Sequence, residues 1–174
     1  MKMGMRRLQL FILLFTMCSL LFQLPSEAFA DSNSSGSVKS TAVINDSTEN
    51  GPVLDDNDRF GWSVANIGDL DGNGITDIVI GATQDDAGGN NRGAVHIMFM
   101  NADGSVDSTV EINALTENGP TLSAKDQFGT SIANIGDLDG DGVNDLIVGA
   151  SRDNAGGADR GTIHVMYMNT DGSV

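Results

Sequence analysis

Residues 68–82 read GDLDGNGITDIVIGA, and residues 136–150 read GDLDGDGVNDLIVGA, which is nearly the same stretch 68 positions later. The similarity extends well beyond these stretches. When residues 39–106 are aligned with residues 107–174, about 40 of the 68 positions are identical. Self-similarity at a fixed period of this length indicates a duplicated structural unit. The sequence therefore predicts two repeats, 39–106 and 107–174.

Each repeat contains short apolar or alternating segments separated by turn residues, without a helical period. Residues 78–80 (Ile-Val-Ile) are β-branched and fully apolar, as expected for a strand that is covered on both faces. Four strands in one repeat are typical of a β-propeller blade. We expect eight strands, near residues 41–45, 60–67, 76–82, 93–101, 109–113, 128–135, 144–150 and 161–169.

The predicted fold class is all-β, a partial β-propeller of about two four-stranded blades. These eight strands would form one four-stranded and one three-stranded blade, with residues 41–45 either dangling or pairing with residues 161–169. A propeller typically needs about four to eight blades to close its ring. We therefore expect this chain to be part of a longer protein, with assembly from several copies as the less favoured alternative.

Two acidic loops carry the strongest chemical pattern. In each, side-chain oxygens recur at positions 1, 3, 5 and 9, and position 7 offers only a main-chain carbonyl. Alternate positions of a tight loop converge on one point, which suits a hard, oxygen-seeking cation. The predicted ligands are Asp69, Asp71, Asn73, Ile75 and Asp77 in the first loop, and Asp137, Asp139, Asp141, Val143 and Asp145 in the second.

The ion that this pattern favours is Ca²⁺. Many protein oxygens converge and no phosphate ligand is implied, which disfavours Mg²⁺, and neither loop contains Cys or His, which disfavours Zn²⁺. An EF-hand is disfavoured because position 12, which requires Glu, is Ile80 or Val148. The alternative is an Asp- and Gly-rich hairpin that binds no metal.

Phe60-Gly61, the first acidic loop and the segment 80–83 (Ile-Gly-Ala-Thr), together with their copies in the second repeat, resemble FG-GAP repeats. The resemblance implies the seven-bladed β-propeller found at the N-terminus of integrin α subunits and in many microbial secreted proteins. It also implies calcium loops in the hairpin between the first two strands of a blade, and adhesion or ligand binding through the propeller face. Thr83 and Ser151 replace the proline of the family pattern, which affects the local loop geometry.

The first 30 residues differ from the rest of the chain. A basic start is followed by the uncharged apolar run 8–24 and by Ala28-Phe29-Ala30, a cleavage site of small residues. This order is typical of a secretory signal peptide, and an uncleaved membrane anchor is the alternative. We expect a signal peptide at 1–30, a short linker at 31–38, and a secreted or cell-surface protein that is not inserted in a membrane after cleavage.

The net charge of −15 argues against binding to nucleic acid or anionic membranes, which requires clustered Lys and Arg. The sequence contains no nucleophile elbow, phosphate-binding loop or paired catalytic carboxylates in a recognisable setting, so we expect no enzyme activity. The leading hypothesis is a calcium-binding propeller module for adhesion or recognition of an unknown protein or glycan ligand. The alternative is an accessory module of an extracellular hydrolase whose catalytic domain is absent from this chain.

Two further features recur in both repeats. Asp85 and Arg92 flank a glycine turn, and we expect them to form an ion pair within that loop, as their copies Asp153 and Arg160 would. The alternative is a loop on the propeller face that contacts a ligand. Histidines lie inside the apolar third strands, where we expect satisfied core residues rather than catalytic bases. These histidines are His96 and His164, and the methionines expected to fill the core are Met98, Met100, Met166 and Met168.

Overall fold

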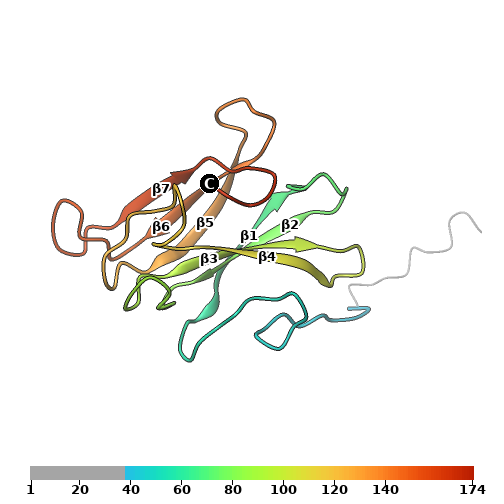
Figure 1. The fold of residues 1–174 in the computed structure, drawn as a ribbon, viewed down its shortest axis with the longest axis horizontal. Coiled ribbons are helices and arrows are strands. Elements are labelled where there is room, and N and C mark those ends of the chain that lie inside the picture. The colour runs from blue at the N-terminus through green and yellow to red at the C-terminus, as the bar shows by residue number, and fades with distance from the viewer. Residues whose placement is uncertain (1–37) are drawn as a thin grey trace, which may run out of the picture. The chain divides into compact units, whose positions relative to one another are not determined.

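Seven antiparallel β-strands form two sheets in residues 38–174, the part of the chain that this computed structural model describes (Figure 1). The first sheet has the order β1-β2-β3-β4 and the second the order β5-β6-β7. The described residues contain no helix. The prediction of an all-β partial propeller, with a four-stranded and a three-stranded blade, is confirmed. The strands are β1 (Phe60–Gly68), β2 (Asp77–Ala82), β3 (Ala94–Met100), β4 (Val106–Ile112), β5 (Phe128–Gly136), β6 (Asp145–Ala150) and β7 (Thr162–Met166).

The predicted strand at residues 41–45 is wrong, because these residues are irregular and lead into a turn. Their counterpart in the next repeat lies largely in β4, which a tight turn returns to the edge of β3. No described strand precedes residues 41–45, so they have no preceding third strand to pair with as β4 pairs with β3. Ile44 instead packs its side chain against an apolar cluster of the first sheet that contains Ile80, Met98 and Val106. The predicted signal peptide, 1–30, lies outside the described residues.

The main core lies between the two sheets. Val95, Ile97 and Phe99 alternate along β3 and turn one face of the first sheet toward the second, where Phe128 and Leu146 belong to the same apolar cluster. Alternation of this kind is expected for a strand whose two faces meet different surroundings. Met98, Met166 and Met168 are buried, which agrees with the predicted role of these methionines as core residues.

Glycines permit the two blades to approach each other closely along their backbones. A Cβ atom added to Gly81 would lie 2.2 Å from the carbonyl oxygen of Gly129, and one added to Gly93 would lie equally close to the carbonyl oxygen of Phe128. The amide of Phe128 donates a hydrogen bond of 2.8 Å to the carbonyl of Arg92. The Phe-Gly and Gly-Ala elements of the repeats therefore meet where consecutive blades pack.

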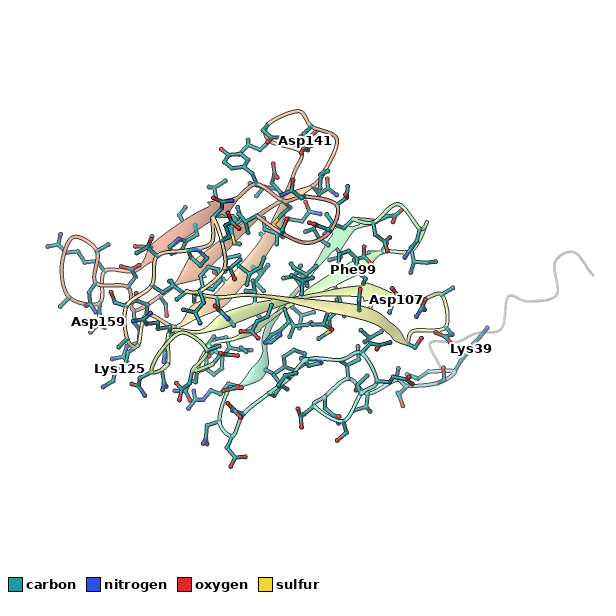
Figure 2. All side chains as sticks on the ribbon, viewed as in Figure 1. Lys39, Phe99, Asp107, Lys125, Asp141 and Asp159 are labelled. Carbon is teal, nitrogen blue, oxygen red and sulfur yellow. The ribbon has the colours of Figure 1, made fainter. Side chains whose placement is uncertain are left out.

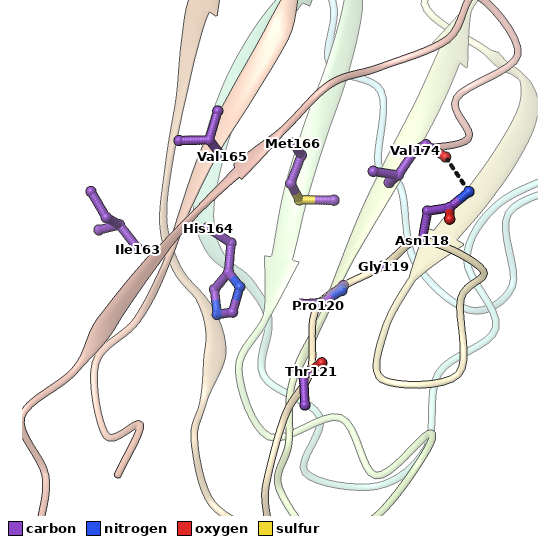
Figure 3. Close-up of a pocket in the computed structure, with 9 residues that line it drawn as sticks. All are labelled: Asn118, Gly119, Pro120, Thr121, Ile163, His164, Val165, Met166 and Val174. Carbon is purple, nitrogen blue, oxygen red and sulfur yellow. Dashed lines mark hydrogen bonds between the residues drawn. The ribbon is translucent and has the colours of Figure 1, made fainter. Parts of the chain in front are cut away.

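The corresponding face of the second blade is exposed. Ile163 is 67% exposed and Val165 is 43% exposed, whereas Val95 and Ile97, their counterparts in the first blade, are fully buried. In Figure 3, Ile163 and Val165 point to one side of β7, and His164 and Met166 point to the other. The side of the second sheet that faces away from the first blade is thus apolar and uncovered among the described residues.

Candidate metal-binding loops

The two acidic loops connect the first and second strands of each blade, as predicted. One joins β1 to β2 and the other joins β5 to β6 (Figure 1). Glycine at the sixth loop position adopts a left-handed conformation in both, with φ of 87° at Gly74 and 93° at Gly142. Other residues adopt this conformation only with strain, so glycine permits the sharp turn that folds the loop back on itself.

The last acidic residue of each loop is buried and firmly held. Asp77 is 0% exposed, and its two carboxylate oxygens accept hydrogen bonds from the amides of Leu70 (2.8 Å) and Met100 (2.9 Å). Asp145 is 1% exposed and accepts corresponding bonds from Leu138 (2.7 Å) and Met168 (3.0 Å). Each carboxylate therefore links its acidic loop to the end of the third strand of its blade, at Met100 in β3 or at Met168 just after β7, and is held in a fixed position.

Three carboxylates converge in each loop. One oxygen from each of Asp69, Asp71 and Asp77 lies within 4.8 Å of the others, and Asp137, Asp139 and Asp145 form the same arrangement. Backbone amides orient the exposed members. Gly74 donates to Asp69 at 2.9 Å, and Gly142 donates to Asp137 at the same distance. The structure thus brings together six of the ten residues predicted as ligands.

The residue at the fifth loop position, Asn73 or Asp141, lies outside the group of three converging carboxylates. The side-chain oxygen of Asn73 accepts a hydrogen bond from the amide of Ile75 (2.7 Å), and that of Asp141 accepts one from the amide of Val143 (2.8 Å). Asp141 does not belong to the three-carboxylate group of its loop, and Figure 2 shows it on the loop that projects beyond the second sheet. Ile75 and Val143 are half-buried; as predicted ligands, they would contribute main-chain carbonyls.

No basic side chain compensates the acidic clusters within residues 38–174. The described ion pairs are Arg152 with Asp159, at 3.4 Å, and His96 with Asp85, at 3.8 Å. A buried carboxylate without a counter-charge is costly, and a bound cation would offset that cost. Every atom that these acidic side chains offer to a metal is an oxygen, the ligand that hard cations prefer. The residues present therefore fit a divalent cation in each loop.

The predicted Asp–Arg pairs are absent from the described residues. Asp85 uses one carboxylate oxygen to accept a hydrogen bond of 2.7 Å from the amide of Ala87. Arg92 instead lies over the glycine turn, where a Cβ atom added to Gly89 would be 2.7 Å from its Nε atom. The second repeat has the same arrangement of Arg160 over its glycine turn.

His96 is not the satisfied core histidine that the sequence predicted. It is 1% exposed, yet neither of its ring nitrogens has a hydrogen-bond partner among the described residues. Its ring packs edge-on against Phe60, with centroids 5.5 Å apart. The structure also gathers Asp85, His96 and Glu111, each offering a ligand atom within 4.8 Å of the others. The sequence analysis missed this group because Glu111 comes close only through strand pairing.

His164 lies beside a pocket of about 380 Å³ between β7 and residues 118–121 (Figure 3). Burial lowers the pKa of His164, and nearby Asp153 and Asp126 act in the opposite direction.

In the first repeat, burial raises the pKa of Asp58, and the charges of Asp85, Asp55 and Asp86 raise it further. Both shifts reflect the cost of burying charge.

Comparison with known proteins agrees with this architecture. The model of the FG-GAP repeat family matches residues 60–98 and 128–166. The chain is 45% identical to integrin alpha-5 of Xenopus laevis over 92 residues, 53% of this chain. It is 41% identical to human integrin alpha-6 over 98 residues and 31% identical to mouse integrin alpha-2 over 100 residues, covering 56% and 58% of the chain.

The chain contains two FG-GAP repeats and has a partial β-propeller fold, and these repeats resemble those of integrin α subunits. The matches cover about 8% of the length of these three relatives. Both family matches lie within the predicted repeats, 39–106 and 107–174. In the part of the chain that the structure describes, no helix is long and apolar enough to cross a membrane.

Proposed function

We propose that this chain is a secreted or cell-surface, calcium-binding FG-GAP propeller module that acts in adhesion or ligand recognition. The observation that carries the proposal is the recurrence of three converging carboxylates in both β-hairpin loops, without a basic partner. Ca²⁺ is the hard cation that most readily accepts a set of carboxylate and carbonyl oxygens. Bound Ca²⁺ would fix each hairpin and thereby the edge of its blade.

The resemblance to integrin α subunits supports a binding role rather than a catalytic one. The ligand in this proposal is a protein or a glycan, and residues 1–30 direct the chain out of the cell. The direct test is to immobilise the chain and measure binding to a panel of extracellular-matrix proteins and glycans. We expect binding in the presence of Ca²⁺ and its loss in chelator and in the double variant Asp71→Ala/Asp139→Ala. Binding that ignores both changes would contradict a calcium-dependent module.

We further propose that additional blades of a longer chain cover the exposed side of the second sheet. Leu70 is 4% exposed and belongs to the core cluster that both blades share, whereas its counterpart Leu138 is 55% exposed. Ile163 and Val165 of β7 are likewise exposed, whereas their counterparts in the first blade are buried. Uncovered apolar patches favour association, so the chain alone should self-associate through this face. Sedimentation should show that the double variant Ile163→Ser/Val165→Ser associates less, and thermal melting should show an unchanged melting temperature. Unchanged association would argue against this face.

A further inference from the structure

A different cluster lies at the opposite end of the first sheet from the acidic loops. β2 begins at Asp77, beside the first acidic loop, and ends at Ala82. The chain then turns, and Asp85 is held at this far end by a hydrogen bond from its own amide to the carbonyl of Ala82 (3.2 Å) and by another from the amide of Gly93 to its carbonyl (3.0 Å). Asp85 thus belongs to neither acidic loop.

Strand pairing brings two further side chains to this place. His96 in β3 is the direct cross-strand partner of Glu111 in β4. Directly opposed residues of an antiparallel pair project from the same face and lie close together. The ligand atoms of Asp85, His96 and Glu111 consequently lie within 4.8 Å of one another. Three different elements, a loop and two strands, supply one ligand each.

In each of the two carboxylates, one oxygen accepts an orienting hydrogen bond, and the other accepts none from the part of the chain that the structure describes. Oδ1 of Asp85 accepts from the amide of Ala87 at 2.7 Å. Oε1 of Glu111 accepts from the side-chain amide of Asn113. Hydrogen bonds of this kind to the outer oxygen of a carboxylate are what orients metal ligands in proteins. The two carboxylates are therefore prepared to bind through their remaining oxygens.

His96 supplies the independent evidence for a ligand. The side chain is 1% exposed, and both ring nitrogens lack a hydrogen-bond partner among residues 38–174. Nε2 lies 3.8 Å from Oδ2 of Asp85, which is too long for a hydrogen bond. An unsatisfied buried polar group is costly, and such groups in native structures usually have an unrecorded partner. A metal ion between the two atoms would satisfy both of them.

The cluster borders an acidic pocket of about 200 Å³. Asp85 and Glu111 line it together with Asp55, Asp58 and Asp86, and no Lys or Arg of the described residues forms an ion pair with these carboxylates. The pocket leaves the cluster accessible to a cation from solvent and provides room for a water molecule at an open coordination position. The local charge favours a cation over any anionic ligand.

We propose that Asp85, His96 and Glu111 form a binding site for a divalent transition metal of the zinc class. Imidazole nitrogen is a ligand for such metals, whereas Ca²⁺ prefers oxygen alone. Two ligands of a tetrahedral Zn²⁺ ion lie about 3.4 Å apart, given metal–ligand bonds of about 2.1 Å. The 3.8 Å separation of Nε2 of His96 and Oδ2 of Asp85 is close to this value, and the other separations in the cluster are at most 4.8 Å. This site is independent of the calcium loops and goes beyond the proposed function.

The test is a Zn²⁺ titration of the full chain in excess Ca²⁺, which occupies the oxygen-only loops. We expect one high-affinity Zn²⁺ per chain, a higher melting temperature on addition of Zn²⁺, and, with Co²⁺ as the probe, the visible absorption of a four-coordinate ion. His96→Gln should weaken Zn²⁺ binding by at least about tenfold. Absence of binding by the unaltered chain would overturn the proposal.

His164 gives a matched control. It packs against Phe128 as His96 packs against Phe60, but it belongs to no group of three potential metal ligands among the described residues. His164→Gln should leave Zn²⁺ affinity unchanged, and an equal loss in both histidine variants would contradict the assignment. If His96→Gln does not fold, Glu111→Gln decides the question. Glu111 is only half-buried, and Gln retains the acceptor for Asn113, so unchanged Zn²⁺ affinity in this variant would also overturn the proposal.

Discussion

The hydroxyl of Ser63 donates a hydrogen bond of 2.6 Å to the carbonyl oxygen of Gly129, which lies 66 residues further along the chain. Ser63 belongs to β1 of the first blade, and Gly129 belongs to the Phe-Gly element that opens the second. This bond joins the two blades at the point where glycine backbones approach most closely. The repeat is thus a unit for packing one blade on the next as well as a unit of sequence.

Ser63→Ala should lower the free energy of unfolding by about 1 kcal/mol, because it removes the donor to a carbonyl at the interface between blades. Ser131 is the equivalent residue of the second repeat, and its hydroxyl makes no hydrogen bond with another described blade. Ser131→Ala is therefore the matched control and should change stability little. Urea denaturation of both variants measures the difference, and equal effects would contradict the interfacial role of Ser63.

Gly129→Ala should be much more damaging than Gly61→Ala. Both glycines have φ of 86°, so each substitution should cost about 1 to 2 kcal/mol for the left-handed conformation. A Cβ atom on Gly61 would have open space, but one on Gly129 would lie 2.6 Å from the carbonyl oxygen of Ala94. Crowding of this kind typically adds about 1 to 3 kcal/mol. Thermal melting of the two variants compares them directly, and similar melting temperatures would show that the blades do not pack as described.

Local sequence was sufficient to predict features that depend on short-range spacing. The alternate acidic positions that begin at Asp69 identified a loop whose carboxylates do converge, and the apolar segment 78–80 identified the inner strand β2. Features that depend on pairing were not predictable in this way. Residues 41–45 resemble part of β4, yet they form no strand because no earlier strand lies beside them in the described chain.

Opposite charges close in sequence were also misleading. Asp85 and Arg92 are seven residues apart, but the glycine turn directs the arginine over its own backbone, and the aspartate faces His96 instead. The proximity of Glu111 to His96 depends on the register of β3 and β4. A recurrent histidine within an apolar strand was the available sequence signal for this cluster, and its unsatisfied nitrogens became evident only in three dimensions.

The stability of the chain should rise with pH as His164 loses its proton. Burial lowers the pKa of His164 in the folded state below the ordinary value of 6.5, so the unfolded chain binds more protons between these two pKa values. The contribution is fully present above pH 6.5 and is lost as the pH falls through the folded-state pKa. Urea denaturation at pH 7.5 and 5.5 should show a smaller loss for His164→Gln than for the unaltered chain. A loss of equal size would refute this role for His164.

The second acidic loop should bind Ca²⁺ more tightly than the first, because Asp141 carries a charge where Asn73 is neutral. Their side-chain oxygens accept equivalent hydrogen bonds, so exchanging them changes mainly the charge. Asp141→Asn should weaken the second site, and Asn73→Asp should strengthen the first, each by about fivefold for roughly 1 kcal/mol of Coulomb energy. Calorimetric titration of the two variants measures both changes. If Asp141→Asn leaves calcium affinity unaltered, the fifth loop position does not contribute to binding.

The most direct test of the account is a Ca²⁺ titration of the full chain, followed by both heat of binding and melting temperature. We predict two sites with dissociation constants in the range of about 10⁻⁴–10⁻³ M that is typical of extracellular modules. At a free Ca²⁺ concentration ten times the dissociation constant, each site should stabilise the fold by about 1.4 kcal/mol. Asp71→Ala and Asp139→Ala should each remove one site, with the larger loss in Asp139→Ala, and the double variant should remove both. A chain that shows neither heat nor a shift in melting temperature with Ca²⁺ would contradict the central claim that the two acidic hairpin loops are calcium sites.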